Sequence, residues 1–234
     1  MKNSIILLLC LSISIFSCEK NGIDPVPSSV NVINAAVNAG AVKVNYFGSP
    51  ISWSSYSTQI SSNSNGIYTM PTGTAVPLVI VPVNDTLHPI FDNHLSLNPF
   101  DIYSLYLIGQ NPNYESLLIK EVIPKITFPD SSLNVRVINL SPNSPPVNVT
   151  LSTSSTINEY TNLAYKQASE FKPYPAKSTN GPSYTFQIRN ASTNALISSS
   201  SVTLNTYRFH SITLVLRGLV AGSPAAGITI VKNY

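Results

Sequence analysis

The chain has 234 residues, of which only 10% are charged, and a formal net charge of +3. The nearest approach to a basic cluster is Lys166, Lys172 and Lys177, which we interpret as solvated loop charges. Binding to nucleic acid or to an anionic membrane surface needs clustered basic residues, so composition argues against both partners. The 18 prolines interrupt helices and favour short strands, and they predict a β-rich protein.

The N-terminal residues have the pattern of a secretory signal. Lys2 precedes an apolar run from Ser4 to Phe16, and Ser17 is the small residue before Cys18. The run is shorter than the roughly 18 to 20 residues that span a bilayer. The sequence Ile15-Phe16-Ser17-Cys18 resembles the lipobox of bacterial lipoproteins, in which the cysteine is acylated before the signal is removed. The resemblance implies a signal peptide at residues 1–17 and a lipid on Cys18.

The alternative is an ordinary signal peptide that is cleaved nearby, with the Cys18 thiol incidental. Cys10 is the only other cysteine, and Leu9 before it does not fit the pattern. Processing before Cys18 would therefore leave no free thiol for a disulfide, a thiolate metal site or a nucleophile. Residues 18–28 would form a tether to the membrane.

An internal repeat predicts two domains after the tether. Val30–Asn34 matches Val135–Asn139 at an offset of 105 residues, and the match extends to Asn38 and Asn143 and to the Val-x-Val pairs that follow. A later match, at an offset of 107, aligns Leu97–Leu107 with Leu204–Leu214 and places His210 opposite Tyr103. We therefore predict repeats at residues 29–128 and 133–234, joined by a short junction at 129–132.

Apolar residues alternate with period two in each repeat, which indicates half-buried strands. In the second repeat the predicted strands are Leu133–Asn139, Val147–Leu151, Tyr184–Arg189, Leu196–Leu204, Phe209–Leu216 and Gly227–Asn233, with a weaker one near Tyr160–Tyr165. About seven strands per repeat predict an all-β chain of two antiparallel β-sandwiches of immunoglobulin or transthyretin-like shape. The short junction predicts that the two domains abut as a rod.

The start of the second repeat resembles a known family. Asn139, Ser141-Pro142, Pro146 and Val147-Asn148-Val149 are similar to the opening motif of the domain of unknown function 4397. This resemblance implies a β-sandwich module of Gram-negative envelope lipoproteins, present singly or in tandem. Asn148 replaces the acid of the family motif. The first repeat departs further, because Ala36-Val37 stands where the family has Ser-Pro.

No motif predicts a catalytic or metal site. The chain has no Gly-x-Ser-x-Gly elbow, no glycine-rich phosphate loop and no carboxylate pair placed for glycoside hydrolysis. The segment His88–His94 contains two imidazoles and Asp92, but we interpret it as a polar loop rather than a metal site. We interpret His210 as a packing residue. The predictions are therefore no catalytic residue, no metal and no cofactor.

Three groups of residues are candidates for binding or modification. Trp53, the only tryptophan, lies near Tyr56 among serines. We expect its ring either to form a platform for a ligand or to pack on the edge of its own domain. Asp85-Thr86-Leu87 resembles an O-glycosylation acceptor with Thr86 as the modified residue. Asn34 and Asn139 end the first strand of each repeat, and we interpret them as structural turn residues rather than ligand contacts.

These features predict an envelope-anchored, non-catalytic lipoprotein, placed at the outer membrane, that acts as a binding or spacer module. A surface glycan-binding accessory protein is the alternative, and an envelope hydrolase is a more distant one. The predicted partners are the membrane, through the N-terminal lipid, and an unidentified envelope protein or glycan.

Overall fold

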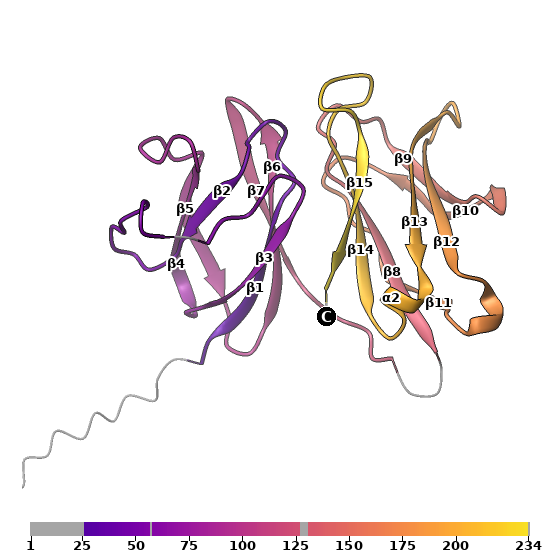
Figure 1. Cartoon of the computed structure of the whole chain (residues 1–234), viewed down its shortest axis with the longest axis horizontal. Coiled ribbons are helices and arrows are strands. Elements are labelled where there is room, and N and C mark those ends of the chain that lie inside the picture. The colour runs from indigo at the N-terminus through magenta and orange to yellow at the C-terminus, as the bar shows by residue number, and fades with distance from the viewer. Residues whose placement is uncertain (1–25, 57, 127–130, 234) are drawn as a thin grey trace, which may run out of the picture.

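The computed structural model describes residues 26–56, 58–126 and 131–233. Within these ranges the chain forms two β-sandwich units in succession (Figure 1), which confirms the predicted all-β class. The predicted signal peptide, Cys18 and most of the predicted tether lie outside the described residues. Two residues of the predicted junction do so as well.

The first unit contains seven strands within the described residues. They are β1 (Ser28–Asn34), β2 (Val42–Asn45), β3 (Asn65–Met70), β4 (Gly73–Pro82), β5 (Phe91–Leu97), β6 (Ile102–Gln110) and β7 (Asn113–Lys120). Four of them form a sheet in the order β3-β1-β6-β7, and the other three form the facing sheet in the order β2-β4-β5.

The second unit contains eight described strands and two short helical turns. The strands are β8 (Ser132–Asn139), β9 (Val147–Leu151), β10 (Ser154–Leu163), β11 (Lys172–Pro175), β12 (Ser183–Asn190), β13 (Leu196–Thr203), β14 (Ser211–Arg217) and β15 (Gly227–Lys232); the turns are η2 (Ser178–Asn180) and α2 (Leu204–Tyr207). The sheet β11-β8-β14-β15 has the strand order of its counterpart in the first unit. The facing sheet, β10-β9-β12-β13, has one additional strand, β10.

One strand pair in each unit is parallel, whereas the sequence predicted antiparallel pairing throughout. β1 pairs with β6 and β8 pairs with β14 in parallel, and the other strand pairs are antiparallel. Parallel neighbours need a long crossover. In the first unit the chain passes from β1 through strands of the facing sheet before it returns to form β6. In the second unit it does the same between β8 and β14.

The predicted strands of the second unit are present with small shifts at their ends. The strand predicted to start at Phe209 begins at Ser211, because Phe209 has a φ of 65°, outside the β region. β11 was not predicted. It contains Pro173 and Pro175 and lies at a sheet edge, where proline is tolerated because a missing N–H costs no ladder hydrogen bond.

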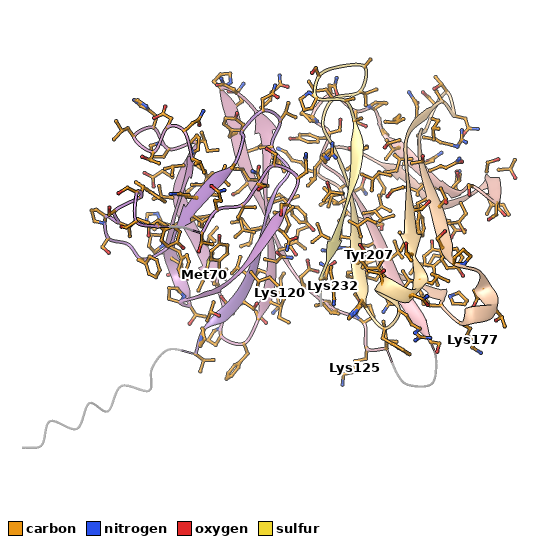
Figure 2. The ribbon with its side chains drawn as sticks, viewed as in Figure 1. Met70, Lys120, Lys125, Lys177, Tyr207 and Lys232 are labelled. Carbon is orange, nitrogen blue, oxygen red and sulfur yellow. The ribbon has the colours of Figure 1, made fainter. Side chains whose placement is uncertain are left out.

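Each sandwich encloses its own hydrophobic core, and a third core lies between the units. Val30 and Val32 of β1 face the first core, and Val135 and Val137 of β8 face the second. Met70, labelled in Figure 2, is fully buried in the first. Between the units the buried apolar residues are Ile33, Ala35, Tyr106, Ile108, Ile138, Leu140, Val215 and Val231.

The four sheets therefore stack as successive layers (Figure 1), with the β1-containing sheet packed against the β8-containing sheet. Both faces of these two middle sheets are covered. The units contact each other through broad sheet faces, and not end to end as the predicted rod implied. The reason is the apolar outer face that β1, β6, β8 and β14 share.

The strand register corrects the second sequence match. Val32 pairs with Leu105 in the first unit and Val137 pairs with Leu214 in the second, so these later strands correspond at an offset of 109 and not 107. His210 is thus equivalent to Asp101, and not to Tyr103 as the sequence match suggested. A shift of two residues preserves which side chains face the core, so alternation could not distinguish the two alignments.

Candidate binding site

Trp53 and Tyr56 lie in the connection between β2 and β3, where the two units differ. In the second unit the corresponding connection forms β10, which pairs with β9 along the sheet edge. In the described part of the first unit this edge of β2 has only an isolated bridge between Val42 and Ile60. Instead of forming an edge strand, the connection places Trp53 beside Pro77 and Val79, on the outer face of the sheet β2-β4-β5.

Side-chain contacts fix this connection in place. The Lys43 ammonium donates to the Trp53 carbonyl at 2.6 Å. The Trp53 and Tyr56 rings meet edge to face, with 6.4 Å between centroids and an interplanar angle of 90°. Both rings are half-buried. Trp53 is thus packed on the domain edge, and it also retains an accessible surface.

That surface is one wall of a cavity of about 370 Å³. Pro77 and Val79 of β4 and Asp92 of β5 also line the cavity, and residues 48–51 close one side. Small-molecule sites measure roughly 300 to 1,000 Å³ and combine apolar surface with a few polar groups. The cavity offers an aromatic ring, aliphatic side chains and one carboxylate.

The second unit has a different surface at the equivalent positions. Val79 pairs with Asp92 in the first unit, and the corresponding pair in the second is Gln187 with Ser199. Gln187 and Ser199 present polar groups on a face that no tryptophan covers. The combination of ring, aliphatic surface and carboxylate therefore belongs to the first unit alone within the described residues.

Thr86 lies in the turn between β4 and β5, beside a second cavity of about 480 Å³. The turn is held by His88 Nδ1, 2.9 Å from a carboxylate oxygen of Asp85, and this hydrogen bond lowers the pKa of Asp85. Leu87 projects into solvent with 85% of its surface exposed, and Thr86 is half-buried. The turn is accessible, and modification of Thr86 stays a prediction.

The histidines do not come together. His88 pairs with Asp85, whereas His94 is exposed on β5. Across residues 26–56, 58–126 and 131–233, no three His, Cys, Asp or Glu side chains are close enough to hold a metal ion. His210 is half-buried just before β14, and its carbonyl accepts a hydrogen bond from the Asn134 N–H at 3.0 Å.

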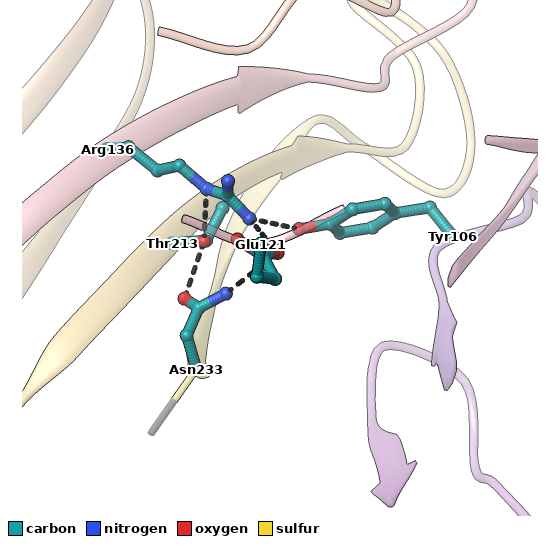
Figure 3. A network of polar contacts seen from close by, with 5 residues as sticks. All are labelled: Tyr106, Glu121, Arg136, Thr213 and Asn233. Carbon is teal, nitrogen blue, oxygen red and sulfur yellow. Dashed lines mark hydrogen bonds and ion pairs between the residues drawn. The ribbon is translucent and has the colours of Figure 1, made fainter. Parts of the chain in front are cut away.

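A buried polar network joins the two units, and the sequence did not predict it (Figure 3). Arg136 of β8 forms an ion pair with Glu121, which follows β7. The Arg136 guanidinium also donates to the Tyr106 hydroxyl at 3.4 Å and to the Thr213 hydroxyl at 2.8 Å. The Asn233 amide donates to Glu121 at 3.2 Å. The network therefore connects β6 and the end of β7 to β8, β14 and the end of β15.

Further contacts surround this network. The guanidinium of Arg136 lies 4.7 Å from the centroid of the Phe171 ring. Lys166 and Glu115 form a second ion pair between the units at 2.7 Å, and Tyr165 donates to Glu115 at 3.4 Å. Burial raises the pKa of Tyr106 and that of Tyr165, the latter to about 12. The interface thus combines an apolar centre with two ion pairs.

Asn34 and Asn139 have structural roles, as the sequence predicted. Both side chains are fully buried. Asn34 donates to the Gly40 carbonyl at 2.8 Å, and Asn139 donates to the Leu163 carbonyl at 3.1 Å. The Asn34 amide ties the exit of β1 to the loop before β2, and the Asn139 amide ties the exit of β8 to the end of β10.

The described helices are all short. None of them has the length and apolar character that crossing a membrane would require.

The comparison with protein families adds one finding. Residues 133–231 match the family described as Domain of unknown function (DUF4397). The matched range is the second sandwich, and it includes the Asn139-to-Val149 motif on which the sequence resemblance rested. The second sandwich is therefore similar to the DUF4397 domain over nearly its whole length. No curated protein matches the chain.

Proposed function

We propose that the protein is an envelope-anchored, non-catalytic lipoprotein in which two sandwiches of the DUF4397 type form a rigid spacer. The contact between the units supports the spacer role most directly, because a buried apolar cluster and the Arg136–Glu121 pair restrict movement of one unit against the other. The shared order of corresponding strands supports an origin by tandem duplication, with the first unit as the divergent copy.

The anchor is proposed from the sequence. The apolar run, Ser17 and Cys18 fit a lipoprotein signal, and residues 18–28 would connect the lipid to β1. Several acyl chains hold a protein firmly, where one gives only marginal membrane binding. Outer-membrane placement is part of the proposal.

Replacement of each cysteine tests the anchor. Cys18→Ala should abolish incorporation of a labelled fatty acid and leave either an unprocessed precursor or a soluble product. Cys10→Ala is the matched control and should be labelled like the wild type. A Cys18→Ala protein that is processed and stays membrane-bound without label would overturn the proposal. Protease treatment of intact cells then distinguishes the outer from the inner face.

The Trp53 cavity favours a second candidate function, glycan binding. A sugar ring stacks its apolar face on an aromatic ring and offers hydroxyls to a carboxylate, and Trp53 and Asp92 line the same cavity. The aliphatic floor formed by Pro77 and Val79 suits the less polar face of a sugar. Such a site would make the lipoprotein a glycan-binding accessory protein.

Because Trp53 is the only tryptophan, its fluorescence reports on this cavity when it is excited selectively over the tyrosines. Titration with methyl glycosides of neutral, amino and acidic hexoses should give a saturable change with at least one of them. Asp92→Ala should raise the dissociation constant by about tenfold or more, because it removes a hydrogen bond from the sugar to a charged group. Ser199→Ala, at the equivalent position of the second unit, should leave it unchanged. No saturable change with any glycoside would remove this candidate.

A further inference from the structure

One end of the molecule combines several features that are far apart in the sequence. β1 and β6 are parallel, so both start at this end, and the antiparallel β7 finishes there. Figure 1 shows β8 of the second unit starting at the same end as β1. We call it the β1 end. The turn between β4 and β5, which carries Leu87, lies at the opposite end.

Exposed apolar side chains mark the β1 end. Phe100, in the loop before β6, and Val122, just after β7, are each 80% exposed. Phe209 occupies the position of Phe100 in the second unit and is 37% exposed. Both phenylalanines have a left-handed backbone, with φ of 63° and 65°. That conformation is unfavourable for a bulky residue, and neither ring belongs to a hydrophobic core.

Basic residues lie toward the same end of the molecule. Lys120, Lys125, Lys177 and Lys232 all lie toward the β1 end (Figure 2). Lys120 pairs with Asp101 at 2.8 Å. The other three have no ion-pair partner among the described residues. The fold thus places these positive charges along one end of the molecule, although they are dispersed in the sequence.

The chain enters the first unit at this same end. The Phe100 N–H donates to the Pro27 carbonyl at 3.3 Å, so Phe100 lies next to the point where residues 18–28 reach the fold. A lipid attached at Cys18 would hold this end nearest the bilayer. An exposed phenylalanine can insert at the boundary between headgroups and acyl chains, and each basic residue close to an anionic surface adds to the attraction.

We infer that the β1 end rests on the headgroup layer of an anionic bilayer, with Phe100 and Val122 inserted and the lysines beside the lipid phosphates. The inference rests on the proposed lipid anchor. The acyl chains would supply the attachment, and this surface would set the orientation. The cavity beside Asp85 would then face away from the membrane.

Vesicle binding by the chain from residue 19 onward tests the surface without the acyl group, so the result is independent of whether Cys18 is modified. The protein should co-sediment with vesicles of phosphatidylglycerol and phosphatidylethanolamine, should bind less as salt is raised, and should not bind pure phosphatidylcholine. Lys125→Gln with Lys177→Gln should weaken binding by roughly fivefold for each lysine. Asn84→Asp with Asn113→Asp lowers the net charge equally at the opposite end and should change binding less than twofold.

A second pair of variants tests insertion of the ring. Phe100→Gly removes the side chain and suits the left-handed backbone, so the fold is retained, and binding should fall several-fold. Leu87→Ser removes an equally exposed apolar side chain at the opposite end and should have no effect. Absence of binding to the anionic vesicles, or equal losses in test and control variants, would overturn the inference even if fatty-acid labelling showed Cys18 to be acylated.

Discussion

Arg136 and Glu121 lose nearly all contact with water where the two units meet, with side-chain exposures of 6% and 0%. Removing two charges from water is costly, and the attraction between them compensates only when other polar groups complete the site. Thr213 and Asn233 supply some of those groups, but Glu121 Oε2 is buried without a hydrogen-bond partner among the described residues. The pair therefore adds specificity to the docking of the units more than it adds net stability.

Replacing one partner should be far more harmful than replacing both. Arg136→Met leaves the Glu121 carboxylate buried without a counter-ion and should lower the free energy of unfolding by about 3 to 5 kcal/mol. Arg136→Met with Glu121→Leu should recover most of that loss. Urea unfolding of the wild type, both single variants and the double variant gives the coupling energy directly. Additive losses would show that the two charges do not act as a pair.

Tyr68 carries a buried hydroxyl that has no partner among the described residues, and burial raises its pKa to about 12. In the unfolded chain the phenol ionises at about pH 10. Between these values the unfolded state has lost a proton that the folded state keeps, so stability should fall as pH rises from about 10 to about 12.

Tyr68→Phe removes the titrating group and should make the alkaline loss of stability shallower. At neutral pH the variant should be as stable as the wild type or more stable, because it removes an unpaired buried hydroxyl. Urea midpoints measured across the alkaline range test both expectations. An unchanged alkaline slope would assign the loss to other groups.

At the scale of single elements, the connection after each first strand depends on one asparagine. The Asn139 amide donates to the Leu163 carbonyl, and its oxygen accepts from the Ser141 N–H at 3.3 Å. The side chain thus links β8, the end of β10 and the Ser-Pro turn. This is why a buried polar residue is present where the alternation of the strand would allow an apolar one.

Asn139→Ala should cost about 1 to 3 kcal/mol, since it leaves buried backbone groups without partners. Asn158→Ala, on the exposed face of β10, is the control and should change the free energy of unfolding by no more than about 0.5 kcal/mol. Thermal or urea unfolding measures both. Equal losses in the two variants would mean that the buried hydrogen bonds of Asn139 add no more to the free energy of unfolding than the exposed amide of Asn158 does.

Period-two alternation was enough to predict most strands of the second unit, because each has one face in a core. It was not enough for β11, whose two prolines argued against a strand. It also could not fix the register of Leu97–Leu107 against the second unit. The sequence did hold one unused signal: Leu105-Tyr106-Leu107-Ile108 is apolar on both faces, which indicates a strand covered on both sides.

The candidate sites were predicted less completely than the fold. Trp53 was identified from its isolation in the sequence, but Asp92 was considered only together with the nearby histidines. The partners Arg136 and Glu121 belong to different units and join only when the units dock. No local pattern reports such a pairing, because it depends on the packing of two sheets that are each formed by distant segments.

At the scale of the whole molecule, stability should depend on the contact between the units as well as on the two cores. The facing sheets bury Ile33 and Tyr106 on one side and Ile138 and Val215 on the other. An isolated unit would expose its half of this surface, and large exposed apolar patches promote association. Residues 131–234 alone should therefore fold cooperatively, as the repeat predicts, but should be less stable and should self-associate.

Val215→Thr should improve the behaviour of the isolated 131–234 fragment but destabilise the full chain. In the isolated 131–234 fragment the position is exposed, so the hydroxyl should reduce self-association, as sedimentation velocity would measure. In the full chain the same hydroxyl is buried against the first unit and should lower the free energy of unfolding by about 1 to 3 kcal/mol. Val202→Thr, inside the second core, should destabilise both forms. A fragment that is monomeric without substitution, together with a full chain that tolerates Val215→Thr, would show that the contact between the units adds little.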